Sequence, residues 1–215
     1  GSEAFRNACY AVASGAYDVA CAIGVEKLKD NGMSGLVVGG IPDDGTKSDL
    51  TAPAMFSLLA PAYAEKYGVD PTEMKDVMGR IAWKNHANGA KNPRAQFQKE
   101  VGRDTICNAP LIAGQLGIFD CSGVSDGSAA AIIVRAEDAH KYTDNPLYVK
   151  ALSFAAGPAR GPIDPDYDYT SFDEVVASAA DAYAQAGVEN PRVEIAMAEV
   201  HDCFTPTELV LMEDL

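Results

Sequence analysis

The sequence is poor in basic residues and in long apolar runs. Its 17 Lys and Arg stand against 31 Asp and Glu, and no basic run interrupts this surplus of carboxylates. Binding to nucleic-acid phosphates needs clustered Lys and Arg, so we expect no nucleic-acid partner. The apolar runs fall well below the roughly 20 residues that cross a bilayer, which predicts a protein without a membrane span.

Paired cysteines are also absent. The five cysteines are odd in number, scattered and never spaced as C-x-x-C, so the sequence predicts neither a disulfide framework nor a zinc site, and we expect no metal. The start lacks the charged, apolar and small-residue order of a signal peptide. We therefore expect a cytoplasmic protein whose cysteines are mostly small buried hydrophobic residues.

Alternating helix and strand patterns predict an α/β fold with a mostly parallel sheet. Runs of small and β-branched residues predict buried strands at residues 17–25, covered on both faces, and 129–134. Further strands are predicted at residues 147–154 and, from the alternation of Ile195, Met197 and Glu199, at residues 193–200. Apolar residues at helical spacing predict helices at residues 2–13, 136–141 and 171–186. Because no strand precedes the first helix, we expect that a β-α-β unit has lost its first strand.

The pattern loosens from about residue 26 to residue 116, which we interpret as an inserted region. Glycine and proline interrupt residues 35–40 and 42–45, and two helices are predicted at residues 52–67 and 71–84. Asp70 is placed to cap the second helix. His86 then falls in a predicted polar loop, where it could face a site, although we favour a structural or solvent-facing role.

His201 lies between a predicted strand and a predicted helix start. Thr205 is the expected N-cap, Pro206 the first helical residue and Glu208 the capping-box partner. In open α/β sheets ligands bind at the carboxyl ends of strands, which favours a functional role for this histidine. The alternative is a structural histidine whose ring nitrogens form hydrogen bonds with the backbone of the loop.

Two other motifs are weaker on chemical grounds. Residues 123–127 match G-x-S-x-G, and Ser125 with an aspartate at 164, 166 or 168 and His201 follows the chain order of an α/β-hydrolase triad. A strand, not a helix, is predicted after Ser125, which argues against a serine hydrolase. Residues 164–168 imitate a calcium loop, but Tyr169 and Val175 stand where that loop needs Gly and Glu.

Several segments together carry a resemblance to a known family, at residues 1–5, 13–19, 92–97, 121–130 and 201–204. In this order they resemble the thiolase superfamily. More narrowly, the Lys-Asn-His and Asn-Pro segments and a His-Asp-Cys-Phe box, where many thiolases have Asn-Glu-Ala-Phe, resemble the sterol-carrier-protein type and acetyl-CoA acetyltransferases.

The resemblance implies a thiolase-like layered α-β-α-β-α fold, incomplete at both ends. Residues 1–145 would form the N-terminal half without its first strands, with the insertion at about 26–116. Residues 146–215 would begin the C-terminal half. The implied activity is Claisen condensation or thiolytic cleavage of acyl-CoA through an acyl-cysteine, with coenzyme A as substrate and no cofactor.

The resemblance also assigns site residues. His201 would donate a ring N–H to the thioester oxygen, which gains negative charge as the enolate forms. Ser122 matches a serine that contacts the pantetheine arm of CoA, and Phe204 would help to line the same channel.

The family's other catalytic groups have no match in this sequence. The nucleophilic cysteine would precede Gly1, and a further histidine and cysteine would follow Leu215, so we nominate no cysteine here as the nucleophile and expect this segment alone to be inactive. A non-catalytic protein that binds CoA thioesters or serves as a scaffold is the alternative. A thiolase-like aldolase with a small OB-fold, zinc-ribbon partner is a third possibility, although such aldolases tend to carry tyrosine in place of the box histidine. Thiolases are typically homo-oligomers, which predicts self-association.

Overall fold

The chain folds into two units of mixed helix and strand. The structure is a computed structural model that describes residues 1–30 and 51–215, apart from the side chains of residues 162 and 163. The first unit comprises Gly1–Ser34 and Val124–Leu152, and the second comprises Gly35–Gly123 and Ser153–Leu215. The predicted loops at 35–40 and 42–45 lie outside the described residues. The predicted division near residue 145 stays a prediction.

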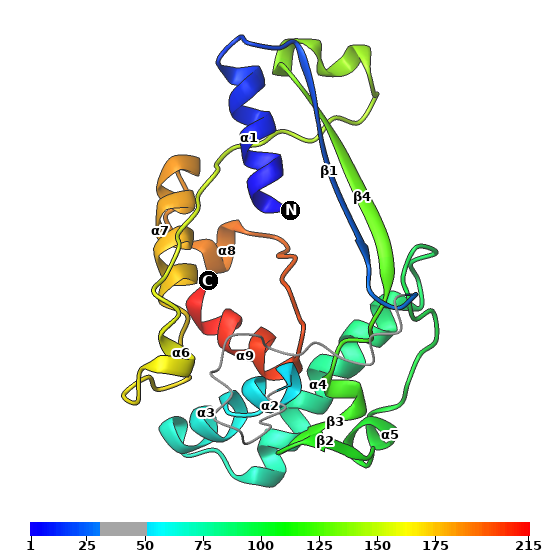
Figure 1. Ribbon diagram of the computed structural model, residues 1–215, viewed down its shortest axis with the longest axis vertical. Coiled ribbons are helices and arrows are strands. Elements are labelled where there is room, and N and C mark those ends of the chain that lie inside the picture. Colours follow the sequence, from blue (N-terminus) through cyan, green and yellow to red (C-terminus); the bar gives the residue numbers. More distant parts are fainter. Residues whose placement is uncertain (31–50) are drawn as a thin grey trace, which may run out of the picture. The chain divides into compact units, whose positions relative to one another are not determined.

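The first unit is a helix packed on a two-stranded antiparallel sheet (Figure 1). Helix α1 (Ser2–Ala13) leads into β1 (Val19–Lys27), and β4 (Asp126–Val134) pairs with β1 along its whole length, from Val19 opposite Val134 to Lys27 opposite Asp126. The 3-10 helix η2 (Ala136–Lys141) follows. The predicted helix and strands are therefore present near their expected positions.

The pairing and burial of these strands differ from the prediction. The pair is antiparallel, and Ile23 and Val25 are 67% and 75% exposed, where a strand covered on both faces was expected. An apolar run indicates that a strand is suited to burial, but it does not indicate which element of the protein covers that strand. The predicted strand at 147–154 is also wrong, because this segment has no strand pairing and Leu147 is 98% exposed.

The second unit is mainly helical. Its elements up to residue 123 are α2 (Ala52–Phe56), α3 (Leu59–Tyr67), α4 (Pro71–Gly89), α5 (Arg103–Cys107), β2 (Leu111–Ala113), β3 (Leu116–Gly117) and η1 (Ile118–Asp120). The later elements are α6 (Arg160–Ile163), α7 (Asp173–Ala186), α8 (Pro191–Glu194) and α9 (Thr205–Asp214). Across the described residues, every helix is too short or too polar to cross a bilayer.

Helix α4 supplies the core of this unit. Its Met74, Met78 and Ile81 recur at helical spacing and are almost fully buried, together with Leu116 from β3 and Leu209 from α9. Burying each such side chain contributes about 1.5–3 kcal/mol, so this face fixes α4 against α9. The predicted start of α4 is confirmed, since the Asp70 side chain accepts a hydrogen bond from the Thr72 amide at 2.8 Å.

Helix boundaries correct three details of the prediction. The helix expected at 52–67 is broken into α2 and α3 by a turn at Ser57–Leu58. Helix α4 continues to Gly89, so His86 lies on a helix and not in the predicted loop. Its ring is half-buried and lies near Phe97 and Phe119, with ring centroids 6.1 and 5.6 Å away.

Candidate functional site

The segment before His201 is extended chain without strand pairing. Helix α8 occupies Pro191–Glu194, and residues 195–202 run from it to α9 with no strand. The predicted strand at 193–200 is therefore wrong. Strand pairing needs a neighbouring strand, and in the described parts of the chain none lies beside this segment. The alternation of Ile195, Met197 and Glu199 consequently builds no ladder, and Met197 is 75% exposed.

The predicted position of His201 just before a helix is confirmed. His201 is exposed, and α9 begins four residues later with Pro206 in its first turn. The N-cap is Phe204 and not Thr205, because the Thr205 hydroxyl points away to another partner. The histidine thus lies on the loop that enters α9.

Backbone hydrogen bonding joins this loop to the segment that contains Ser122. Cys121 and Phe204 form an isolated antiparallel bridge, and the Ser122 amide donates to the Cys203 carbonyl at 2.9 Å. Two segments that are distant in sequence, and that were both assigned to substrate, therefore lie side by side. Ser122 and His201 are both exposed there.

Phe204 anchors the box in the core of the second unit. Its side chain is buried and stacks on Phe56, with ring centroids 4.7 Å apart. This packing fixes the end of the loop against α2. The assignment of Phe204 to a substrate channel stays a prediction.

A buried carboxylate lies beneath the bridge. Asp120 is 2% exposed and accepts hydrogen bonds from Lys75 Nζ at 2.6 Å, the Gly117 amide at 2.7 Å and Thr205 Oγ1 at 3.1 Å. These donors come from α4, β3 and α9. Because a buried charge is tolerated only when it is well paired, this set of donors makes Asp120 a structural anchor.

A second carboxylate cluster includes Asp202 of the box itself and Glu208 of α9. Asn85 Nδ2 donates to Asp202 Oδ2 at 2.5 Å and to Glu208 Oε2 at 2.9 Å, while Lys84 pairs with the other oxygen of Glu208. Burial and the neighbouring Glu208 raise the pKa of Asp202 to about 6, against the opposing effects of Asn85 and Lys84. The carboxyl next to His201 therefore holds its proton more tightly than an ordinary aspartate.

Two family profiles match most of the chain. Residues 1–137 match the profile described as "Thiolase, N-terminal domain", and residues 161–215 match the one described as "Thiolase C-terminal domain-like". The chain belongs to the thiolase family. The family resemblance seen in the sequence is thus confirmed.

Curated relatives agree with this assignment. An acetyl-CoA acetyltransferase of Methanothermobacter thermautotrophicus is 34% identical over the whole chain, and one of Methanocaldococcus jannaschii is 33% identical. Sterol carrier protein 2 of Oryctolagus cuniculus is 31% identical over 80% of the chain and 31% of that protein. The chain spans only 55% and 54% of the two acetyltransferases, so it corresponds to about half of their length.

Solved structures share the fold. The Ltp2-ChsH2(DUF35) aldolase superposes with a TM-score of 0.76 at 26% identity, covering 98% of this chain and 55% of that one. The dimeric peroxisomal thiolase of Saccharomyces cerevisiae superposes with a TM-score of 0.63 at 15% identity, covering 100% and 58%, which shows likeness of fold alone. The predicted thiolase-like α/β fold is confirmed, although the strands described here pair antiparallel.

The cysteines near the site of this thiolase-family chain are not activated. Burial, assisted by the charge of Asp120, raises the pKa of Cys121 to about 11, and burial also raises the pKa of Cys203. The thiolate is the nucleophilic form, so these two thiols are protonated and unreactive at neutral pH. The structure thus supports naming neither of them as the nucleophile.

The serine-hydrolase alternative finds no support in the local structure. Ser125 directly precedes β4, so it lies before a strand and not on the strand-to-helix turn that a nucleophile elbow requires. The following Asp126 accepts a hydrogen bond from the Lys29 amide at 2.8 Å. The G-x-S-x-G match therefore belongs to the entry into the sheet of the first unit.

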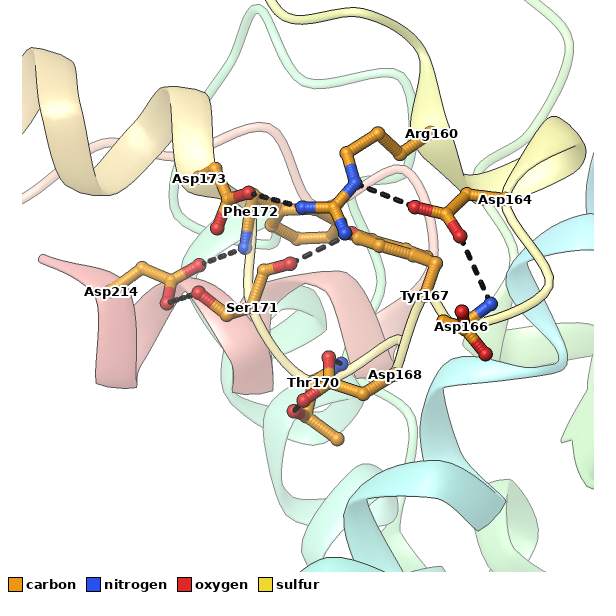
Figure 2. A network of polar contacts seen from close by, with 10 residues as sticks. All are labelled: Arg160, Asp164, Asp166, Tyr167, Asp168, Thr170, Ser171, Phe172, Asp173 and Asp214. Atoms are coloured by element: carbon orange, nitrogen blue, oxygen red, sulfur yellow. Dashed lines mark hydrogen bonds and ion pairs between the residues drawn. The ribbon is translucent and has the colours of Figure 1, made fainter.

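The carboxylates of the acidic loop at 164–168 accept hydrogen bonds from donors in and near this loop (Figure 2). Asp164 accepts from Arg160 Nε at 2.8 Å and from the Asp166 amide at 3.0 Å, and Asp168 accepts from the Thr170 hydroxyl at 2.7 Å. These hydrogen bonds, from Arg160 and from Thr170 respectively, lower the pKa of Asp164 and of Asp168. Within residues 1–30 and 51–215 no cluster of His, Cys, Asp or Glu is suited to hold a metal ion.

Proposed function

We propose that the whole protein is an acyl-CoA acyltransferase of the thiolase type, an acetyl-CoA acetyltransferase or 3-ketoacyl-CoA thiolase. It would condense or cleave acyl-CoA through an acyl-cysteine contributed from outside these 215 residues. The relatives of about one-third identity that bear the acetyltransferase name support this activity. A cytoplasmic location and a homodimer belong to the same proposal.

The observation that carries the proposal is the bridge between the two predicted substrate segments. The Ser122 amide donates a hydrogen bond to the Cys203 carbonyl, so the segments that carry the exposed Ser122 and the exposed His201 lie side by side. His201 would donate its ring N–H to the thioester oxygen, and Ser122 would contact the pantetheine arm. A fixed donor is most effective where charge develops during the reaction, as it does on this oxygen in Claisen chemistry.

A test of this proposal is the intact mass of the whole protein before and after incubation with acetoacetyl-CoA. We expect one covalent acetyl group per subunit, and we expect CoA to discharge it. A protein that consumes no acetoacetyl-CoA and forms no adduct would contradict the proposal. Tight binding of the thioester without an adduct would instead support the alternative of a non-catalytic CoA-thioester-binding protein.

One observation favours a second candidate, a thiolase-like aldolase that works with a partner protein. The Ltp2-ChsH2(DUF35) aldolase has the higher TM-score of the two structures compared above. Against this candidate stands His201, since the resembling aldolases tend to carry tyrosine at that position. Retro-aldol cleavage of a β-hydroxyacyl-CoA in the presence of a co-purified small partner, with no thiolysis of acetoacetyl-CoA, would favour the aldolase.

A further inference from the structure

Asn85 is a polar residue on the apolar face of α4. The buried residues Met74, Met78 and Ile81 mark this face, and Asn85 follows Ile81 by four residues and Met78 by seven. Helical spacing at this position calls for another apolar side chain. A polar residue at a half-buried position of an apolar face needs specific hydrogen-bond partners to offset its burial.

The partners of Asn85 are two carboxylates that would otherwise repel each other. Its single amide nitrogen reaches both Asp202 Oδ2, at 2.5 Å, and Glu208 Oε2, at 2.9 Å. Glu208 has a second partner in Lys84. Asp202 has less support, because its other oxygen, Oδ1, is buried without a hydrogen-bond partner in the part of the chain that the structure describes.

Asp202 attaches the loop beside His201 to α4, and its amide also donates to the Val200 carbonyl at 3.2 Å, across His201 itself. The Asp202 side chain is held by Asn85, and the next carbonyl, that of Cys203, is held by the Ser122 amide. On the other side, residues 195–199 are exposed and unpaired by strand hydrogen bonds. Asn85 and Ser122 therefore tie the loop to the rest of the unit on the C-terminal side of His201.

We infer that Asn85 is a positioning residue for His201, which it orients by holding Asp202 against α4. This inference rests on the proposed function of His201 as the oxyanion donor. Asn85 itself touches no substrate. Its effect is transmitted through one hydrogen bond and one peptide unit.

A misplaced oxyanion donor changes the transition state more than the bound substrate. We therefore expect Asn85→Ala, made in the whole protein, to lower kcat for acetoacetyl-CoA thiolysis by about tenfold or more, with KM changed by less than about threefold. Asn88→Ala is the matched control. Asn88 is exposed on the same helix, one turn further on, and its loss is expected to leave both constants unchanged.

A double-mutant cycle separates positioning from a general structural effect. If Asn85 acts through His201, then Asn85→Ala has no further effect on kcat once His201→Ala is present. Additive losses would overturn the inference. Where Asn85→Ala does not fold, the same cycle with Asp202→Ala breaks the contact from the side of the box and is interpreted in the same way.

The ring resonances of His201 give a readout that does not depend on turnover. We expect them to shift in Asn85→Ala and to remain in place in Asn88→Ala. A protein without thiolase activity whose His201 resonances still respond in this way would contradict the proposed function and leave the inference intact. An active protein in which His201→Ala lowers kcat but Asn85→Ala changes neither kcat nor the resonances would contradict only the inference.

Discussion

Two carboxylates are supported very differently: Asp202 lies within the His-Asp-Cys-Phe box, and Asp120 is bonded to Thr205 directly after it. Asp120 accepts hydrogen bonds from a lysine, a backbone amide and a threonine hydroxyl. Asp202 accepts one from Asn85, and burial beside Glu208 raises its pKa to about 6. A fully paired buried charge is typical of a structural anchor, whereas a partly paired one is typical of a functional site. The box is thus anchored by one fully paired carboxylate and contains another that is sensitive to protonation.

The largest expected effect is on the Asp120 side. Asp120→Ala should lower the free energy of unfolding of the whole protein by about 3–5 kcal/mol, because it leaves the half-buried Lys75 ammonium unpaired and removes the tie to Thr205. Urea denaturation measures this loss. Asp126→Ala, at an exposed position in β4, is the matched control and should cost about 1 kcal/mol or less. Equal losses for the two variants would remove the distinction between anchor and surface carboxylate.

A smaller effect is expected from Asp202→Asn, and it depends on pH. The charges near Asp202 are those of Glu208 on α9, Lys84 on α4 and Asp120 on η1. A carboxyl whose folded-state pKa is raised from 3.8 to about 6 binds its proton more tightly when folded, so the unsubstituted protein loses stability as pH rises from about 4 to about 6.

The asparagine variant cannot titrate at this position. Its free energy of unfolding relative to the unsubstituted protein should therefore rise by about 2 kcal/mol across this window and stay constant above it. Urea denaturation at a series of pH values between 4 and 8 tests this. Parallel curves for the two proteins would show that Asp202 has an ordinary proton affinity, and the contrast with Asp120 would then fail.

The smallest expected effect is at Ser122. Its backbone amide holds the box, but its hydroxyl is assigned to the substrate. Ser122→Ala should therefore raise KM by about fivefold with kcat unchanged, as expected for the loss of one hydrogen bond of about 1 kcal/mol. Steady-state kinetics with acetoacetyl-CoA measure it. Ser125→Ala should leave both constants unchanged. A loss of activity in this variant would support the alternative in which Ser125 is a nucleophile.

Elements set by local pattern could be predicted from the sequence. The apolar spacing and end of α1, the Asp70 cap of α4 and the extent of α7 follow from side chains close together in the chain. The strand positions of β1 and β4 were also evident from their composition. Their antiparallel pairing was not, because pairing depends on which distant segment reaches the edge.

The site could be predicted only in part, for a related reason. His201 and Ser122 were assigned through a family resemblance, and the hydrogen bond that joins their segments lies between residues far apart in sequence. The prediction of a strand at 193–200 was wrong, because a segment with alternating apolar residues forms a β-strand only where another strand lies beside it. Asn85 did leave a signal, an amide at the spacing of Met78 and Ile81, but its two carboxylate partners become visible only when α4 meets α9.

The central claim is that His201 stabilises the oxyanion of the substrate. The most direct test is kcat for acetoacetyl-CoA thiolysis by the whole protein with histidine, alanine or asparagine at position 201. We expect His201→Ala to lower kcat by about 10²- to 10³-fold. His201→Asn should recover a large part of this loss, because its amide supplies an N–H donor at the same place. An alanine variant that turns over at the rate of the unsubstituted protein would contradict the role of His201.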